Sequence, residues 1–126
     1  MTSPSHRPPG WPAVAPRIFT ADVDGLVAFL RTTFDAACDV HPGRPSEMWI
    51  DGSVIIVSDG GGLREPTPAF TYVYVPDTEA AFARALAAGA TQVEPPTDQF
   101  YGDRRATIRD PWGNHWQLAT RIAARD

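Results

Sequence analysis

The chain has 126 residues with a formal net charge of −4, and 43% of its residues are hydrophobic. A chain of this length is the size of one ordinary domain and can bury a core without a disulfide or a metal. The acidic balance and a single adjacent basic pair, Arg104-Arg105, argue against nucleic acid as a partner, and no apolar run approaches the roughly 20 residues that span a membrane. One cysteine, Cys38, excludes an intrachain disulfide.

The first half of the chain reads as a tail, a strand, a helix and a hairpin. Residues 1–12 are a flexible, proline-rich tail that lacks the apolar region of a secretory signal, so we expect a cytoplasmic protein. A short extended segment follows over 14–20. Apolar residues at helical spacing predict a helix over 22–34. The pair Asp51-Gly52 lies between two apolar runs and predicts a hairpin over 47–58.

The second half repeats this order after a flexible connector at 60–62. Aromatic and β-branched residues predict a strand over 70–75, and an alanine-rich segment predicts a helix over 77–88 that ends at Gly89. The remaining elements are expected to be strands over 91–94, 104–109 and 114–121, a loop over 95–102 and a tight turn over 110–113.

The two halves are also similar in sequence, as the segments DVDGLVAFLRTTFDA and DTEAAFARALAAGA show. A duplicated βαβββ unit explains this order, because neither half could easily bury its sheet alone. We therefore predict an α+β fold in which two βαβββ modules form one concave mixed sheet with the helices outside. The single domain spans 13–122, with modules at about 13–60 and 69–122.

The segment from Asp98 to Leu118 carries the most specific pattern in the chain. Its most telling parts are the runs Phe100-Tyr101-Gly102-Asp103-Arg104 and Asp110-Pro111-Trp112-Gly113-Asn114. This segment resembles the C-terminal signature of the vicinal oxygen chelate superfamily, the glyoxalase/bleomycin-resistance/dioxygenase proteins, and is particularly similar to its PhnB-like branch. The helix over 77–89 and the run Ala15-Pro16-Arg17-Ile18 fit the same branch.

The resemblance implies the glyoxalase/bleomycin-resistance fold, with paired βαβββ modules around a cup-shaped cavity. It also implies a homodimer, often with modules arranged across the two chains. The activities it implies are glyoxalase-type isomerisation, ring-cleaving dioxygenation, thiol transfer to antibiotics, epimerisation, and drug sequestration without chemistry. Because a fold does not determine a function, the choice among them depends on the residues of the cavity.

Catalytic members of the superfamily hold a divalent metal with His, Glu or Gln side chains on the cavity face. The resemblance places the ligand positions near Pro12 or Ala15, at Phe70 and at Gln117. Proline, alanine and phenylalanine side chains offer no donor to a metal ion. We therefore expect no metal cofactor of the usual kind.

Three residues remain as weak metal candidates. His115 and Gln117 share one strand face, and Glu47 adds a carboxylate. A hydrogen-bonding role is favoured for His115 and for Gln117, so a divalent metal stays the alternative.

Aromatic side chains are expected to line the cavity instead. Alternation along a strand places Phe70, Tyr72 and Tyr74 on the cavity face. Such a face holds flat or hydrophobic ligands by stacking, although the same aromatics could fill the core or a dimer contact. The predicted ligand-binding residues are Trp49, Phe70, Tyr72, Tyr74, Phe100, Tyr101, Arg109, Trp112, His115 and Gln117.

Two further groups extend this prediction. Arg17, Arg105 and Arg109 could supply charge for an anionic ligand or could be solvated surface residues. The resemblance places the loop over 95–102 near the cavity mouth, where Phe100 and Tyr101 are expected to cover a bound ligand or to seal the dimer; a plain surface loop is the alternative.

We therefore favour a metal-independent protein that binds a hydrophobic or aromatic small molecule, with an antibiotic among the candidate ligands, as bleomycin-resistance proteins do. The alternative is a glyoxalase-type or dioxygenase-type lyase or isomerase with a degenerate divalent-metal site. A weaker third hypothesis is metal-free acid–base catalysis by His115 or Tyr72.

Overall fold

The computed structural model describes residues 6–40, 43–62 and 65–123, and it contains two four-stranded sheets and two helices. The sheets have the strand orders β1-β4-β3-β2 and β5-β8-β7-β6, so each combines one parallel pair with two antiparallel pairs. This duplication confirms the predicted α+β fold. Within the described residues, no helix is long and apolar enough to cross a membrane.

The first module runs from β1 to β4, and a short 3-10 turn, Gly60–Gly62, follows it. Asp22 caps the N-terminus of the helix by accepting a hydrogen bond from the backbone N–H of Gly25, and the helix ends at Asp35 in a left-handed conformation. The elements of this module are β1 (Arg17–Phe19), α1 (Val23–Phe34), β2 (Ala37–Asp39), β3 (Ser46–Ile50) and β4 (Ser53–Ser58).

The second module repeats the same order. Asp77 caps its helix by accepting a hydrogen bond from the backbone N–H of Ala80. Its elements are β5 (Phe70–Tyr74), α2 (Thr78–Ala87), β6 (Thr91–Asp98), β7 (Asp103–Arg109) and β8 (His115–Arg121).

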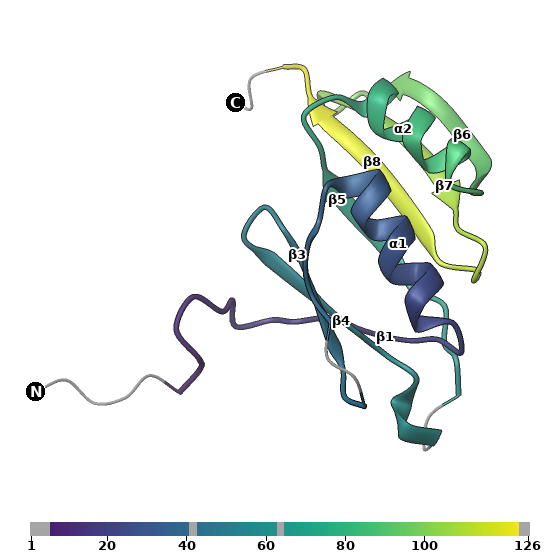
Figure 1. The fold of residues 1–126 in the computed structure, drawn as a ribbon. Helices are drawn as coiled ribbons and strands as arrows, with labels where there is room; N and C mark the ends of the chain where they lie inside the picture. The colour runs from purple at the N-terminus through teal and green to yellow at the C-terminus, as the bar shows by residue number, and fades with distance from the viewer. Residues whose placement is uncertain (1–5, 41–42, 63–64, 124–126) are drawn as a thin grey trace, which may run out of the picture.

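The core lies between the helices and one face of each sheet. Figure 1 shows α1 along the junction of the two sheets and α2 over the second sheet. Strand alternation directs Val73, Ile108 and Trp116 toward the helices, and all three are buried. The side chains one position away lie on the opposite side of the sheets, which we call the helix-free face.

Aromatic contacts join α1 to the second module. The ring of Phe34 lies 5.4 Å from that of Trp116, and the ring of Phe29 lies 6.1 Å from that of Trp112. Trp112 also donates a hydrogen bond from Nε1 to the N-cap carboxylate of Asp22. The modules therefore share one core rather than two.

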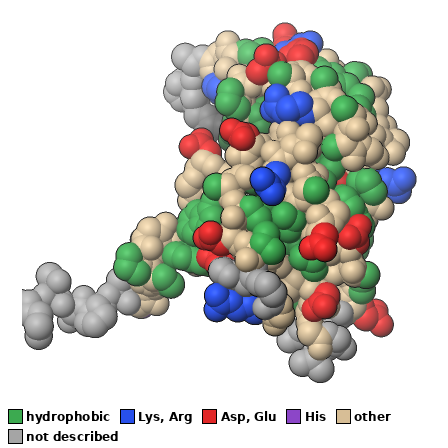
Figure 2. Space-filling model, in the orientation of Figure 1, with side chains coloured by type: hydrophobic (Ala, Val, Ile, Leu, Met, Phe, Trp, Pro, Cys, Tyr) green, Lys and Arg blue, Asp and Glu red, His purple; other side chains and the backbone are tan. Residues whose placement is uncertain are grey.

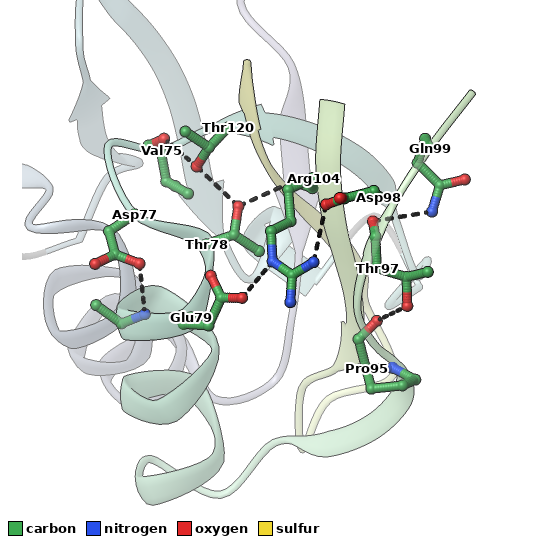
Figure 3. A network of polar contacts seen from close by, with 11 residues as sticks. Val75, Asp77, Thr78, Glu79, Pro95, Thr97, Asp98, Gln99, Arg104 and Thr120 are labelled. Atoms are coloured by element: carbon green, nitrogen blue, oxygen red, sulfur yellow. Dashed lines mark hydrogen bonds and ion pairs between the residues drawn. The ribbon is translucent and has the colours of Figure 1, made fainter. Parts of the chain in front are cut away.

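A polar network fixes the start of α2 against β7 and β8 (Figure 3). The buried hydroxyl of Thr78 lies 3.0 Å from the backbone oxygen of Arg104 and 2.8 Å from the hydroxyl of Thr120. The guanidinium of Arg104 pairs with Glu79 of the helix and with Asp98 at the end of β6. Polar contacts therefore hold α2 on the second sheet, in addition to its apolar packing.

Two sequence predictions about elements were wrong. The short edge strand β2 was not predicted, because three residues of mixed character give no periodic signal. The segment 95–98 was predicted as loop but belongs to β6, which pairs with β7 through two register irregularities. Prolines are tolerated there because β6 is the edge strand of its sheet.

Candidate functional site

The helix-free face of the second sheet gathers polar and aromatic side chains from neighbouring strands. Strand register puts Tyr72 of β5 beside Gln117 of β8, and Gln117 beside Thr107 of β7. Since side chains two positions apart share a face, Phe70 and Tyr74 lie on this side too. The sheet thus brings together residues that are up to 47 positions apart, from Phe70 to Gln117.

Asp103, the first residue of β7, is the buried acceptor of the hydrogen bonds at one end of this face, and it has no exposed surface. Its Oδ2 accepts hydrogen bonds from the hydroxyls of Tyr72 at 2.7 Å and Tyr74 at 2.8 Å, and its Oδ1 pairs with Arg121 at 3.0 Å. The tyrosine hydrogen bonds and the guanidinium of Arg121 lower the pKa of Asp103 and outweigh the opposing effect of burial. This carboxylate therefore carries its charge at neutral pH.

A chain of hydrogen bonds leads from Tyr72 toward the edge of the sheet. The hydroxyl of Tyr72 lies 3.1 Å from that of Tyr101, and Arg105 donates to the Tyr101 hydroxyl at 3.2 Å. Arg105 also pairs with Glu94 of β6. The Arg105 charge is therefore already balanced by an acidic partner.

Beside this chain lies a stacked aromatic pair. The rings of Phe70 and His115 are 5.2 Å apart and 6° from parallel. Phe70 is 65% exposed, so the outer surface of this pair is open to a further ring. Next to it, Gln117 donates a long hydrogen bond to the hydroxyl of Thr107, which itself donates to Glu94.

A groove of about 380 Å³ separates the start of β4 from β5. Its lining is mainly apolar and includes Tyr72 and Tyr74 of the second sheet together with Ile50, Val54 and Ile55 of the first. This volume is within the range of pockets that hold a small ligand.

Three larger hollows lie elsewhere among the described residues. One, of about 810 Å³, lies beside Gly60 and Gly61, and another, of about 650 Å³, lies between the end of α1 and the start of α2. The third, of about 410 Å³, lies along the second half of α1. Arginines and aspartates contribute to all three linings, whereas the smaller groove has a mainly apolar lining that includes two tyrosines. We therefore place the candidate site at the groove and the aromatic face beside it.

The first sheet contributes a second aromatic contact. Trp49 of β3 meets Trp11 edge to face, with ring centres 5.2 Å apart. Glu47 lies two positions earlier on the same strand face, and Arg17 of β1 stacks over Phe19 with its guanidinium 5.0 Å from the ring centre. The segment that precedes β1 therefore reaches the strand that carries Trp49.

The predicted site residues fall into two groups. The structure gathers Phe70, Tyr72, Tyr74, Tyr101, His115 and Gln117 on the helix-free face of one sheet. Arg109 pairs in register with His115 and lies on the same face, at its exposed end. Trp49 lies on the other sheet, and Phe100 is fully exposed beyond β6. Trp112 lies on the helix side against α1.

Sequence reasoning missed the three charged residues that organise the face: Asp103, Glu94 and Arg121. Asp103 lies in the motif Phe100–Arg104, but no periodic pattern in a sequence indicates that a carboxylate is buried. Alternation from Arg105 along the same strand would have placed Asp103 on the cavity side. Glu94 and Arg121 join the site only through strand pairing, which a single sequence does not specify.

The donor groups of this face do not fit a metal site of the usual kind. Within the described part of the chain, no three His, Cys, Asp or Glu residues are grouped so that they could hold a metal ion. His115 is stacked on Phe70, and the amide of Gln117 is turned toward Thr107. Asp103 has both oxygens committed to tyrosines and to Arg121.

The surface charge on the face viewed in Figure 2 is mixed. Acidic and basic side chains alternate there among apolar ones, and no single basic stripe crosses it. A nucleic-acid-binding face would gather its arginines, so this view is consistent with the acidic composition of the chain.

Comparison with known proteins assigns the fold and the sequence to the same group. Residues 3–118 match the model of the Glyoxalase/Bleomycin resistance protein/Dioxygenase superfamily. An uncharacterized protein of Mycobacterium bovis is 33% identical over 127 residues, which cover 85% of this chain and 82% of the relative. A protein of Mycobacterium tuberculosis is also 33% identical and covers 85% of this chain and 73% of its own.

Solved structures agree on the fold. TioX from Micromonospora sp. ML1 superposes with a TM-score of 0.73 at 24% identity, covering 86% of this chain and 97% of TioX. A glyoxalase/bleomycin resistance protein/dioxygenase family enzyme from Burkholderia phytofirmans superposes with a TM-score of 0.72 at 20% identity, with the same coverage of 86% and 97%.

Proposed function

The chain belongs to the glyoxalase/bleomycin resistance protein/dioxygenase superfamily, and within it we propose a metal-independent protein that binds a hydrophobic or aromatic small molecule. The observation that carries this proposal is the exposed Phe70–His115 stack beside an apolar groove of about 380 Å³. A flat ligand can cover the stack and place its edge in the groove. Drug or antibiotic sequestration, as in bleomycin-resistance proteins, is the corresponding biological role.

The chemistry of the donors supports binding over metal catalysis. A metal that polarises a substrate needs several ligands with free lone pairs and an open coordination position. Here Asp103, Glu94 and Gln117 already have hydrogen-bond partners from within the sheet. Recruiting them to a metal would break those bonds and leave buried polar groups unpaired.

We further propose that the protein is a homodimer of the PhnB-like branch. The run Phe100–Arg104 supports this branch, as does the turn at 110–113. Exposed Phe70, Tyr74 and Phe100 on or beside the helix-free face support association with a second copy, which would close the open side of the groove.

Tryptophan fluorescence tests ligand binding. Trp49 lies on the first sheet and pairs in register with Val54, which lines the groove, whereas Trp112 and Trp116 lie on the helix side. Titration with a panel of aromatic and antibiotic ligands is expected to quench the emission. The quenching should be largely lost in Trp49→Phe and kept in Trp112→Phe, and a panel without any quenching would contradict the proposal.

Elemental analysis separates binding from the metal-dependent alternative. We expect protein purified without a chelator to contain well below one equivalent of Zn, Ni, Mn or Fe. Stoichiometric metal that is lost in His115→Ala or Gln117→Ala would instead support a lyase, isomerase or dioxygenase with a residual metal site.

A further inference from the structure

The hydrogen bonds around Tyr72 have a fixed direction that follows from the chemistry of their two ends. At one end, the guanidinium of Arg105 can only donate, so the hydroxyl oxygen of Tyr101 must accept from it. At the other end, the carboxylate of Asp103 can only accept, so Tyr72 must donate its single proton there, over 2.7 Å.

The middle bond of the chain is then determined. Tyr72 has no second proton to offer, so the contact of 3.1 Å between the two hydroxyls is a donation from Tyr101 to Tyr72. Both phenol protons are thus used inside the protein. The hydroxyl oxygens of Tyr72 and Tyr101 can offer only lone pairs to a ligand.

The protonation states hold this direction in place. Hydrogen bonds from Tyr72, Tyr74 and Arg121 lower the pKa of Asp103, so it stays an acceptor at neutral pH. Burial, together with the contacts to Tyr101 and Asp103, raises the pKa of Tyr72, so its hydroxyl keeps the proton. The hydroxyl pair is therefore not easily reversed by a change of pH near neutrality.

The same residues meet the apolar groove. Tyr72 is 37% exposed and, with Tyr74, both lines the groove and donates to Asp103. The two tyrosine rings meet edge to face with centres 5.4 Å apart. The hydroxyl of Tyr72 reaches from β5 across β8 to Asp103 on β7, so it lies over the helix-free face rather than in the groove. A ligand ring that extends from the groove over the tyrosine rings would therefore contact aromatic carbon and approach hydroxyl oxygens that only accept.

We propose that this face selects aromatic ligands carrying an O–H or N–H donor, directed at the oxygens of Tyr72 and Tyr101, and rejects ligands that present only acceptors there. The inference rests on the proposed binding function and adds the polarity of the ligand. A carboxylate or an ether at this place would meet lone pairs, leaving its own desolvated acceptor unpaired.

Three probes with one ring system test the selection by protein-observed NMR titration. The probes are 2-naphthol, which donates, 2-methoxynaphthalene, which is neutral and only accepts, and 2-naphthoate, which is an anionic acceptor. We expect 2-naphthol to bind about tenfold more tightly than either of the others. Equal affinities would overturn the selection but leave aromatic binding intact, whereas no binding of any probe would overturn the proposed function as well.

Two matched tyrosine variants test the direction itself. In Tyr72→Phe, the proton of Tyr101 has lost its acceptor and becomes available to a ligand, so the preference for 2-naphthol over 2-methoxynaphthalene should fall to about twofold or less. In Tyr101→Phe, one of the two acceptor oxygens is lost but Tyr72 still donates to Asp103, so the affinity for 2-naphthol should fall while 2-naphthol still binds more tightly than 2-methoxynaphthalene. The readout is the ratio of two affinities within one variant, so a general loss of stability does not produce the expected change. An unchanged ratio in Tyr72→Phe would contradict the proposal.

Discussion

At the scale of single residues, Asp103 shows how one buried charge can organise a binding face. It is fully buried, and three side chains from two strands donate to it. A buried carboxylate is tolerated only when its oxygens are satisfied in this way. The bond from Tyr72 also fixes the orientation of its hydroxyl, so the charge of Asp103 supports both folding and the chemistry that this face offers to a ligand.

The pH dependence of stability tests this role. The pKa of Asp103 is lowered from its ordinary value of 3.8, so the unfolded chain binds this proton more readily than the folded chain. The stabilisation by Asp103 is therefore complete above about pH 5 and is lost as the pH falls through the lower, folded-state pKa. Urea unfolding of the parent and of Asp103→Asn should show a large stability difference at pH 7 that shrinks below pH 4.

Asp59→Asn provides the control, because Asp59 is exposed on the loop after β4. We expect it to leave the free energy of unfolding nearly unchanged at pH 7. A stability difference for Asp103→Asn that is the same at pH 3 and pH 7 would show that the charge of Asp103 is not what stabilises the fold.

The site also shows which residues a sequence can and cannot predict. Alternation along one strand placed Tyr72 and Tyr74 together correctly, since that rule needs only neighbours in the chain. The contact of Tyr72 with Asp103 spans 31 positions and depends on how β5, β8 and β7 pair. No local pattern encodes that pairing, so the residue that organises the face was not predicted.

At the scale of elements, the long and periodic segments were predicted and the irregular ones were not. The helix over 22–34 and the hairpin at Asp51-Gly52 were confirmed, because each carries a strong local signal. The predicted strand ended at 94, before Pro95, because proline argues against a central strand, whereas β6 continues to Asp98. It is an edge strand with register irregularities, a property of the whole sheet rather than of the segment.

Gly25 in α1 gives a prediction at this scale. A Cβ added there would lie 2.2 Å from Oδ2 of Asp22 and 2.6 Å from Cζ2 of Trp112. Glycine therefore permits the turn between β7 and β8 to pack on α1. Replacement of glycine by alanine normally stabilises a helix interior by about 0.5–1 kcal/mol, but here overpacking should reverse the sign and destabilise the fold by about 2 kcal/mol.

Thermal and urea unfolding would measure the effect of Gly25→Ala. Ala28→Gly, at an exposed position of the same helix, is the matched control and should cost only the ordinary helix penalty of about 0.5–1 kcal/mol. The penalty of Gly25→Ala should also shrink in a Trp112→Ala background, since one of the two clashing groups is then absent. A stabilising Gly25→Ala would refute the packing explanation.

At the scale of the whole molecule, the two modules place both helices against a shared core and leave the helix-free face open. Phe34 and Trp116 contact each other across the modules on the buried side. On the open side, Phe70 is 65% exposed and Tyr74 is 53% exposed, beside a groove bordered by both sheets. The architecture thus separates the residues that stabilise the fold from those that are available to bind.

Phe100 is the extreme case of this separation and gives the last prediction. Its side chain is fully exposed, and its ring has only the edge-to-face contact with Tyr101, at 5.3 Å, among the ring contacts of the described residues. Replacing it with alanine should leave the free energy of unfolding of an isolated chain almost unchanged.

If a second copy covers Phe100, the same change should weaken dimerisation on the order of tenfold or more, as expected for a buried aromatic anchor. Sedimentation equilibrium of Phe100→Ala would measure the dimer dissociation constant, with Leu86→Ala on the outer surface of α2 as the control for loss of an exposed apolar side chain. A dimer that is equally stable in both variants would place the contact between copies away from this loop and leave Phe100 as a residue of the ligand-binding mouth alone.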